Sequence, residues 1–147
     1  MEHLWSILAR EVIVAQDTGN VSLINVVERI GFTTDPKKKR PKGPIGVPVQ
    51  FTLITTWKRS NWDKPESGRA RVLVADPTGK NLRSQMSPEY NVDLNSSVYF
   101  RVTLFFPAFP FTISGMYSIT TQMREGRKWR SVGSVPLQLI DTIANPD

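Results

Sequence analysis

The chain has 147 residues, with 19 lysines and arginines against 13 acidic residues and a formal net charge of +6. It has no cysteine and one histidine, which excludes disulfides, thiolate metal sites, cysteine nucleophiles and multi-histidine metal sites. A Ser-His-Asp triad is not expected, because we expect His3 to lie in a frayed terminus. The length and the apolar content predict one domain over residues 1–147.

The first predicted element is a β-hairpin. Residues 7–16 and 21–28 are rich in β-branched side chains and flank the turn signal Asp17-Thr18-Gly19-Asn20. The apolar spacing between residues 4 and 11 also fits one helical turn, but the run Val12-Ile13-Val14 favours a strand. No basic region precedes an apolar stretch here, so we expect no secretory signal and a cytoplasmic location.

A basic segment rich in proline and glycine follows at residues 33–48, and we expect it to be a mobile loop. Five of the cations lie in it, which leaves the rest of the chain nearly neutral. They are Lys37, Lys38, Lys39, Arg40 and Lys42. One interpretation is a solvated loop that protects a sheet edge from pairing. The alternative is an arm that binds a polyanion, or a nuclear import signal.

The remaining elements are predicted strands. Period-two alternation is clearest from Val98 to Leu104, and further strands are expected at 51–57, 69–75, 117–123 and 128–139, with a weaker one at 81–86. The strand at 128–139 is expected to bend around Gly133 and Pro136. Turn signals at 76–79 and 125–126 separate the predicted strands. Seven or eight strands with such turns predict an all-β, antiparallel, immunoglobulin-like sandwich. Tyr117 fits a tyrosine corner, in which its hydroxyl bonds the preceding chain.

Two segments interleave tryptophan with cations, a mixture that can stack a base and pair with phosphate. The first contains Trp57, Lys58, Arg59 and Trp62, and the second runs from Arg124 to Arg130 around Trp129. Ordinary packing, with tryptophan at a strand end covering the core and the neighbouring cations in solvent, is the simpler interpretation of both segments.

A phenylalanine-rich crossing offers a different kind of surface. Phe106, Phe109 and Phe111 lie close together and form a candidate interaction loop, although burial between sheets is the simpler alternative. Asp17, Asp35, Asp63 and Asp76 all fall in expected turns, where a structural role suffices. No catalytic, cofactor or metal residues are assigned.

A set of turn and core residues spans most of the chain: the hairpin at 14–28, Phe106-Pro107, Gly115-Met116-Tyr117 and Val135-Pro136-Leu137. In these residues the sequence resembles a family of uncharacterised bacterial proteins. The resemblance implies a small immunoglobulin-like sandwich and brings no catalytic residue with it. The lysine-rich segment at 37–42 is not part of this pattern.

These observations favour a non-catalytic interaction or assembly module that binds another protein or a second copy of itself. The alternative is a polyanion or nucleic-acid binder that uses segment 37–42 with Trp57 and Trp62, and a carboxylate-dependent enzyme comes third. No membrane insertion is expected, because the longest uncharged run, between Arg101 and Arg124, contains two prolines and a glycine.

Overall fold

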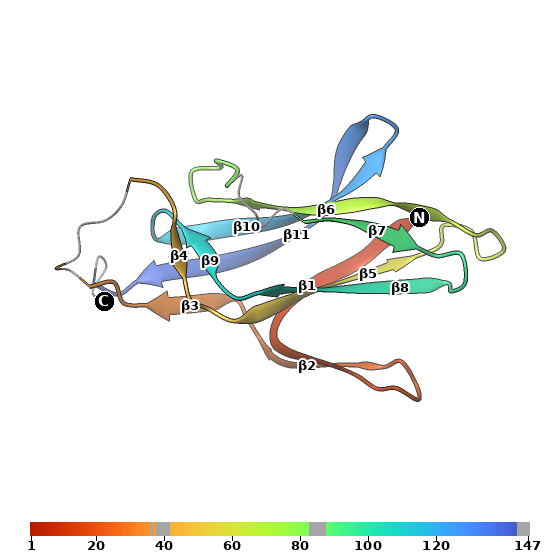
Figure 1. The fold of residues 1–147 in the computed structure, drawn as a ribbon, viewed down its shortest axis with the longest axis horizontal. Coiled ribbons are helices and arrows are strands. Elements are labelled where there is room, and N and C mark those ends of the chain that lie inside the picture. The colour runs from red at the N-terminus through yellow and green to blue at the C-terminus, as the bar shows by residue number, and fades with distance from the viewer. Residues whose placement is uncertain (36, 38–41, 83–87, 144–147) are drawn as a thin grey trace.

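A computed structural model describes residues 1–35, 37, 42–82 and 88–143 (Figure 1). Within these ranges the chain forms eleven β-strands and no helix, which confirms the all-β class. Accordingly, this described part of the chain has no helix long and apolar enough to cross a membrane. The strands form two larger sheets and one short ribbon.

The four-stranded sheet has the order β2-β1-β5-β8, and all neighbouring strands are antiparallel. Its strands are β1 (Glu2–Val14), β2 (Val21–Val26), β5 (Phe51–Lys58) and β8 (Tyr99–Phe106). Residues 2–9 of β1 pair with β5, whereas residues 9–14 pair with β2. The predicted hairpin is therefore confirmed. Residues 10–26 project from the body as a two-stranded ribbon, which we call the arm (Figure 1).

The five-stranded sheet has the order β3-β11-β10-β6-β7. Its strands are β3 (Arg29–Phe32), β6 (Ser67–Ala75), β7 (Glu89–Asp93), β10 (Gly115–Glu125) and β11 (Lys128–Asp141). The β10–β11 hairpin turns at Gly126, which has a φ of 59°. Unlike the other pairs, β3 runs parallel to β11. This pair corrects the expectation of a purely antiparallel fold.

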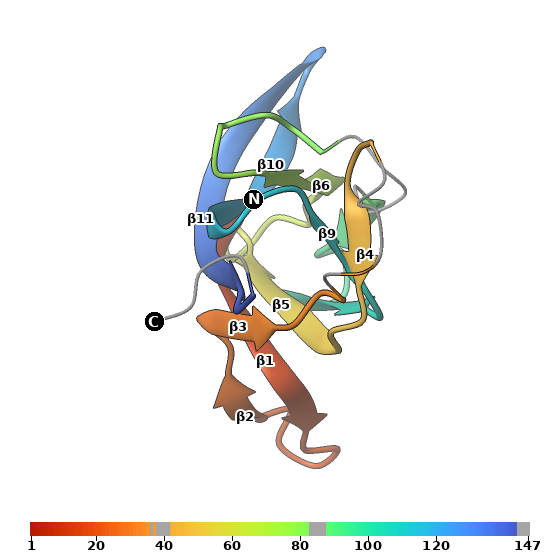
Figure 2. The same cartoon turned by 90° about the vertical axis from the view of Figure 1, so that its left-hand side faces the viewer.

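A short antiparallel ribbon joins β4 (Ile45–Val47) to β9 (Phe109–Phe111). It crosses between the two larger sheets near one end of the molecule (Figures 1 and 2). The segment at 33–48 is therefore not a loop throughout, because its last part is a strand. Val47 is buried among the core side chains, which explains why this part is ordered.

The core lies between the two larger sheets. Leu53 of β5, Ile119 of β10 and Leu137 of β11 belong to its larger cluster, and Trp57 and Met123 belong to a smaller one. Hydroxyl pairs also link the sheets, because Ser6 Oγ lies 3.2 Å from Thr121 Oγ1, and Thr55 Oγ1 lies 3.2 Å from the hydroxyl of Tyr90.

The predicted tyrosine corner is present at Tyr117. Its fully buried hydroxyl accepts hydrogen bonds from the N–H groups of Thr112 (2.8 Å) and Ile113 (3.2 Å), and it donates to the carbonyl of Ile113 (2.8 Å). The ring thus packs in the core while its oxygen satisfies the backbone of the turn before β10.

The structure has more strands than the seven or eight predicted. Several of the eleven are short, as in β3, β4 and β9. Runs of three or four residues carry too little alternation to mark a strand, and they depend on partners elsewhere in the chain. Residues 81–82 form an isolated bridge from Asn81 to Ala75, and the rest of the weaker candidate at 81–86 lies outside the described residues.

Candidate functional site

The candidate interaction loop is part of the core. Phe106, Phe109 and Phe111 are at most 3% exposed, and the ring of Phe109 lies 5.7 Å from that of Phe51 and 5.6 Å from that of Tyr117. This corrects the hypothesis that the three side chains offer a surface to a partner. They are buried because the β4–β9 ribbon folds between the sheets.

The first tryptophan segment does not form a stacking site. Trp57 is fully buried, and the ring of His3 packs edge-on against it at 5.2 Å. His3 is therefore held within β1 and is not frayed. Trp62 is 59% exposed and contacts the ring of Tyr99 at 6.1 Å. One indole is inside and the other outside, so Trp57 and Trp62 cannot act as a pair.

The cations of that segment have structural partners. Lys58 Nζ lies 3.0 Å from a carboxylate oxygen of Glu2. Arg59 donates to the carbonyls of Leu94 (2.7 Å), Trp62 (2.9 Å) and Asn95 (2.9 Å). This guanidinium ties the loop after β5 to the loop after β7, so it is not free to bind a phosphate.

The basic segment is described at Lys37 and Lys42, both of which are exposed. The N–H of Lys37 donates to Asp35 Oδ1 at 3.0 Å, an Asx turn. Lys38, Lys39 and Arg40 lie outside the described residues, so the hypothesis that this segment binds a polyanion stays a prediction.

The four aspartates lie in different turns. Asp17 and Asp35 accept hydrogen bonds from the N–H groups of Thr18 and Lys37, and Asp63 lies in the loop after β5. Asp76 Oδ1 accepts from the N–H groups of Thr78 (2.9 Å) and Lys80 (3.1 Å). Burial raises the pKa of Asp76, but these bonds and others from the Thr78 and Thr112 hydroxyls outweigh it and leave the pKa lowered. This pattern describes a turn cap.

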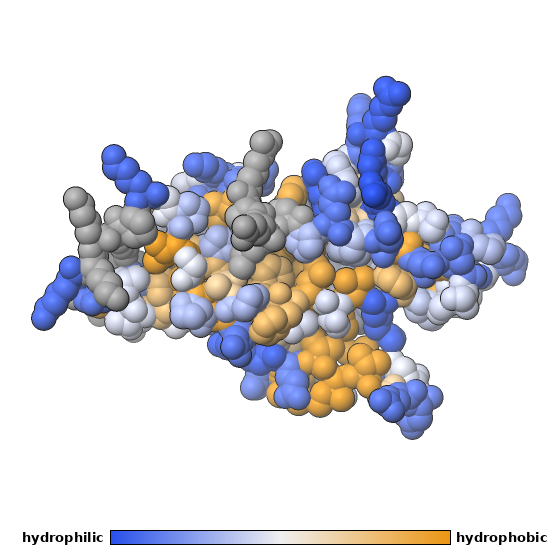
Figure 3. Space-filling view, in the orientation of Figure 1, coloured by the Kyte–Doolittle hydropathy of each residue, from blue (hydrophilic) through white to orange (hydrophobic). Residues whose placement is uncertain are grey.

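The arm carries apolar side chains on both faces. Directly paired residues share a face of a hairpin, so one face holds Val12, Val14, Val21 and Leu23, and the other holds Ile13, Ile24 and Val26. Val14, Ile13, Ile24 and Val26 are between 40% and 56% exposed. Figure 3 shows this apolar surface where Figure 1 places the arm.

The arm also exposes a strand edge. Strand β2 is the last strand of its sheet, and its sequence Val-Ser-Leu-Ile-Asn-Val has no charged residue and no proline. Natural edge strands usually carry such residues, because they prevent pairing with other chains. The side chain of Arg101 steadies the tip by donating to the carbonyl of Gly19 at 2.6 Å.

A groove continues the apolar surface at the foot of the arm. Its volume is about 510 Å³, and Val26, Met116 and Val135 line it, with Glu28 and Arg29 among the polar residues. Val26 and Met116 are 56% and 55% exposed. The apolar surface therefore extends from the arm onto the five-stranded sheet.

The sequence contains a signal for the exposed arm in addition to the turn at 17–20. In the runs Val12-Ile13-Val14 and 21–26, apolar residues stand at odd and even positions alike, so they would be exposed on at least one face of a hairpin. Such a pattern indicates either a strand buried on both faces or a surface that needs a cover.

Comparison with known proteins adds no relative: no family model matches the chain, and no curated protein matches it significantly. The resemblance to a bacterial family therefore stays a prediction.

Proposed function

We propose that this protein is a non-catalytic assembly module that associates with a second copy of itself through the arm. One observation carries the proposal: β2 is an uncharged edge strand in an arm with exposed apolar side chains on both faces. Its backbone groups on the free edge can pair with an added strand, a recurring mode of protein recognition.

A second β2 is the partner that this edge fits best. Two copies related by a twofold axis place β2 antiparallel to β2, so that each strand offers the other the same surface. No like charges meet, because β2 has none. Pairing joins two four-stranded sheets into one continuous sheet and covers Ile24 and Val26 from both copies.

We also propose that the fold is a variant of the immunoglobulin-like sandwich, as the resemblance to a family of uncharacterised bacterial proteins implies. The facing sheets and the tyrosine corner at Tyr117 support this assignment. The parallel β3–β11 pair and the β4–β9 ribbon are additions to that arrangement.

Light scattering at two protein concentrations tests the assembly. We expect the wild-type mass to approach that of two chains at the higher concentration and to fall on dilution. The substitution Ile24→Lys should keep the mass of one chain at both concentrations, because the introduced ammonium groups meet near the twofold axis. Glu11 lies directly opposite Ile24 in β1, so the ammonium has a partner within the arm, and the fold should be retained.

The matched control is Ile113→Lys. Ile113 is 46% exposed and precedes β10, outside the arm. This variant should associate as the wild type does. A wild-type protein that is monomeric at both concentrations overturns the proposal, as does equal loss of association in both variants.

A further inference from the structure

A ladder of polar side chains crosses the outer face of the five-stranded sheet, over β6, β10 and β11. Arg71 Nε donates to Gln122 Oε1 at 2.9 Å, and Gln122 Nε2 donates to Ser131 Oγ at 3.2 Å. The strand register places Arg71 opposite Gln122 and Gln122 opposite Ser131. The ladder therefore directs the Arg71 side chain across β10 toward β11.

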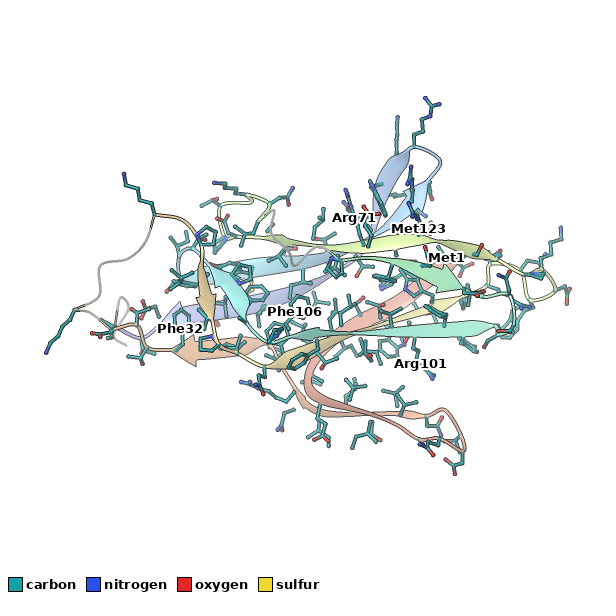
Figure 4. All side chains as sticks on the ribbon, viewed as in Figure 1. Met1, Phe32, Arg71, Arg101, Phe106 and Met123 are labelled. Atoms are coloured by element: carbon teal, nitrogen blue, oxygen red, sulfur yellow. The ribbon has the colours of Figure 1, made fainter. Side chains whose placement is uncertain are left out.

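The Arg71 guanidinium lies over the ring of Trp129, with Cζ 4.3 Å from the ring centroid. This is a cation–π contact between planar groups. Trp129 is half-buried, and it faces outward because it is paired directly with the exposed Arg124. Arg71 lies at the foot of the β10–β11 hairpin, which stands away from the sheet (Figures 1 and 4).

Positive charge surrounds this stacked pair. Arg69 precedes Arg71 by two residues in β6, so it shares the outer face, and Arg124 shares that face through its pairing with Trp129. Arg127 and Lys128 are exposed at the hairpin tip. In the described part of the chain, the one ion pair of this hairpin joins Arg130 to Glu125 at 2.6 Å.

One acidic residue lies close in register. Glu89 of β7 is opposite Arg71, but the guanidinium extends over β10, on the other side of its own strand. The outer face therefore keeps a surplus of positive charge. We call the set Arg69, Arg71, Gln122, Arg124 and Trp129 the basic platform.

We propose that the basic platform binds single-stranded nucleic acid. The Trp129 ring and the Arg71 guanidinium supply planes on which bases stack, and Arg69 and Arg124 supply charge for the phosphates. A single strand fits better than a duplex because its bases expose their faces to such planes. Arg71 and the β10–β11 hairpin lie on the opposite side of the molecule from the arm (Figures 1 and 4), so this proposal does not rest on the assembly proposed above.

Fluorescence anisotropy with a labelled oligothymidylate of about 16 nucleotides tests this site. We expect binding at low salt that quenches tryptophan fluorescence and weakens as salt is added. Trp129→Ala should weaken binding by about 5- to 150-fold, as expected for the loss of one stacked base, and Trp129→Phe should restore most of it. Arg69→Gln and Arg124→Gln should each reduce the slope of log K against log salt by about 0.7.

The matched control is Arg29→Gln, which removes the same charge from β3; this strand pairs with residues 138–141 of β11, at the opposite end of that strand from Trp129. The control should leave the affinity close to that of the wild type. Absence of salt-sensitive binding at low salt overturns the proposal, as does an Arg29→Gln effect equal to that of Arg124→Gln. Oligonucleotide binding that does not change in Trp129→Ala overturns the single-strand site. If heparin also competes with that binding, the surface is a general polyanion surface. Circular dichroism of each variant verifies that the fold is retained.

Discussion

His3 is held at a junction between the two larger sheets. Its Nε2 lies 2.7 Å from Ser6 Oγ, its ring packs against Trp57, and a Cβ added at Gly133 would lie 2.5 Å from its Cε1 atom. Burial lowers the pKa of His3 from its ordinary value of 6.5, although hydrogen bonds to the backbone of Val132 and Trp5 oppose the shift. The folded protein therefore favours the neutral imidazole.

This lowered pKa makes stability depend on pH. As the pH falls below 6.5, the unfolded chain takes up a proton at His3 before the folded chain does, so the free energy of unfolding decreases. We expect urea unfolding midpoints to decrease between pH 7.5 and 5.5. The decrease should be smaller in His3→Gln, because His3 is the single histidine of the chain. An identical decrease in both proteins would contradict this assignment.

At Tyr117, the hydroxyl forms hydrogen bonds with backbone groups of the turn before β10. Tyr117→Phe leaves the N–H groups of Thr112 and Ile113 without this acceptor in a part-buried corner, and we expect it to lower the free energy of unfolding by about 1–3 kcal/mol. Chemical denaturation measures the change. The control Tyr99→Phe alters a tyrosine that is 46% exposed and should change stability by less than about 0.5 kcal/mol.

Among the elements, β11 bends where it approaches β1. Thr121 of β10 pairs with Gly133 of β11, but the next residue, Gln122, pairs with Ser131. The strand β11 therefore has one extra residue at this point, which is a β-bulge. At this bend Gly133 leaves room for the His3 ring. The sequence predicted a bend around Gly133, but the partner that occupies the space comes from the other end of the chain.

Gly133→Ala should therefore destabilise the fold by about 1–3 kcal/mol, because the added methyl group overlaps a ring that packs against Trp57. Thermal unfolding of a double-mutant cycle with His3→Ala provides the measurement. Once the ring is gone, we expect Gly133→Ala to cost much less. Additive effects of the two substitutions would show that the clash is not the cause.

The predicted elements that the structure confirms are those whose signals lie in one contiguous stretch of sequence. The turns at 17–20 and 125–126 each contain a glycine with positive φ. The strands beside the first turn are rich in β-branched residues, and β10, before the second turn, alternates between buried and more exposed residues. The missed strands depend on distant partners instead. Thus β3 pairs with the last residues of β11, and β4 is ordered by the buried phenylalanines of β9. Local patterns contain no information about such pairings.

At the scale of the whole molecule, the candidate sites also divide into those that a local sequence pattern predicts and those that depend on residues distant in sequence. The sequence analysis placed the excess positive charge at 37–42 because those cations are contiguous. The structure gathers a second group, Arg69, Arg71 and Arg124, from strands that are distant in sequence. The sequence pattern singled out Arg124 with Trp129, but strand register decides which side chains share a face, so the addition of Arg69 and Arg71 could not be found before the sheet order was known.

The molecule therefore presents two surfaces of different chemistry on different sides. The arm is apolar and uncharged along its edge, whereas the basic platform is polar and cationic. Salt affects the two surfaces differently, since added salt screens phosphate contacts but leaves strand pairing and apolar burial largely intact. The two proposals can thus be separated by a single solution variable.

The arm and the body share one uninterrupted strand. In β1, Ala9 pairs with Val26 of the arm and with Thr52 of β5, so no hinge separates the two pairings. A pull on the arm runs along β1 and loads its hydrogen bonds to β5 in shear, because antiparallel ladder bonds lie perpendicular to the strands. These bonds resist such a pull together, not one after another. An assembly built through the arm would thereby transmit mechanical tension directly into the core of each subunit.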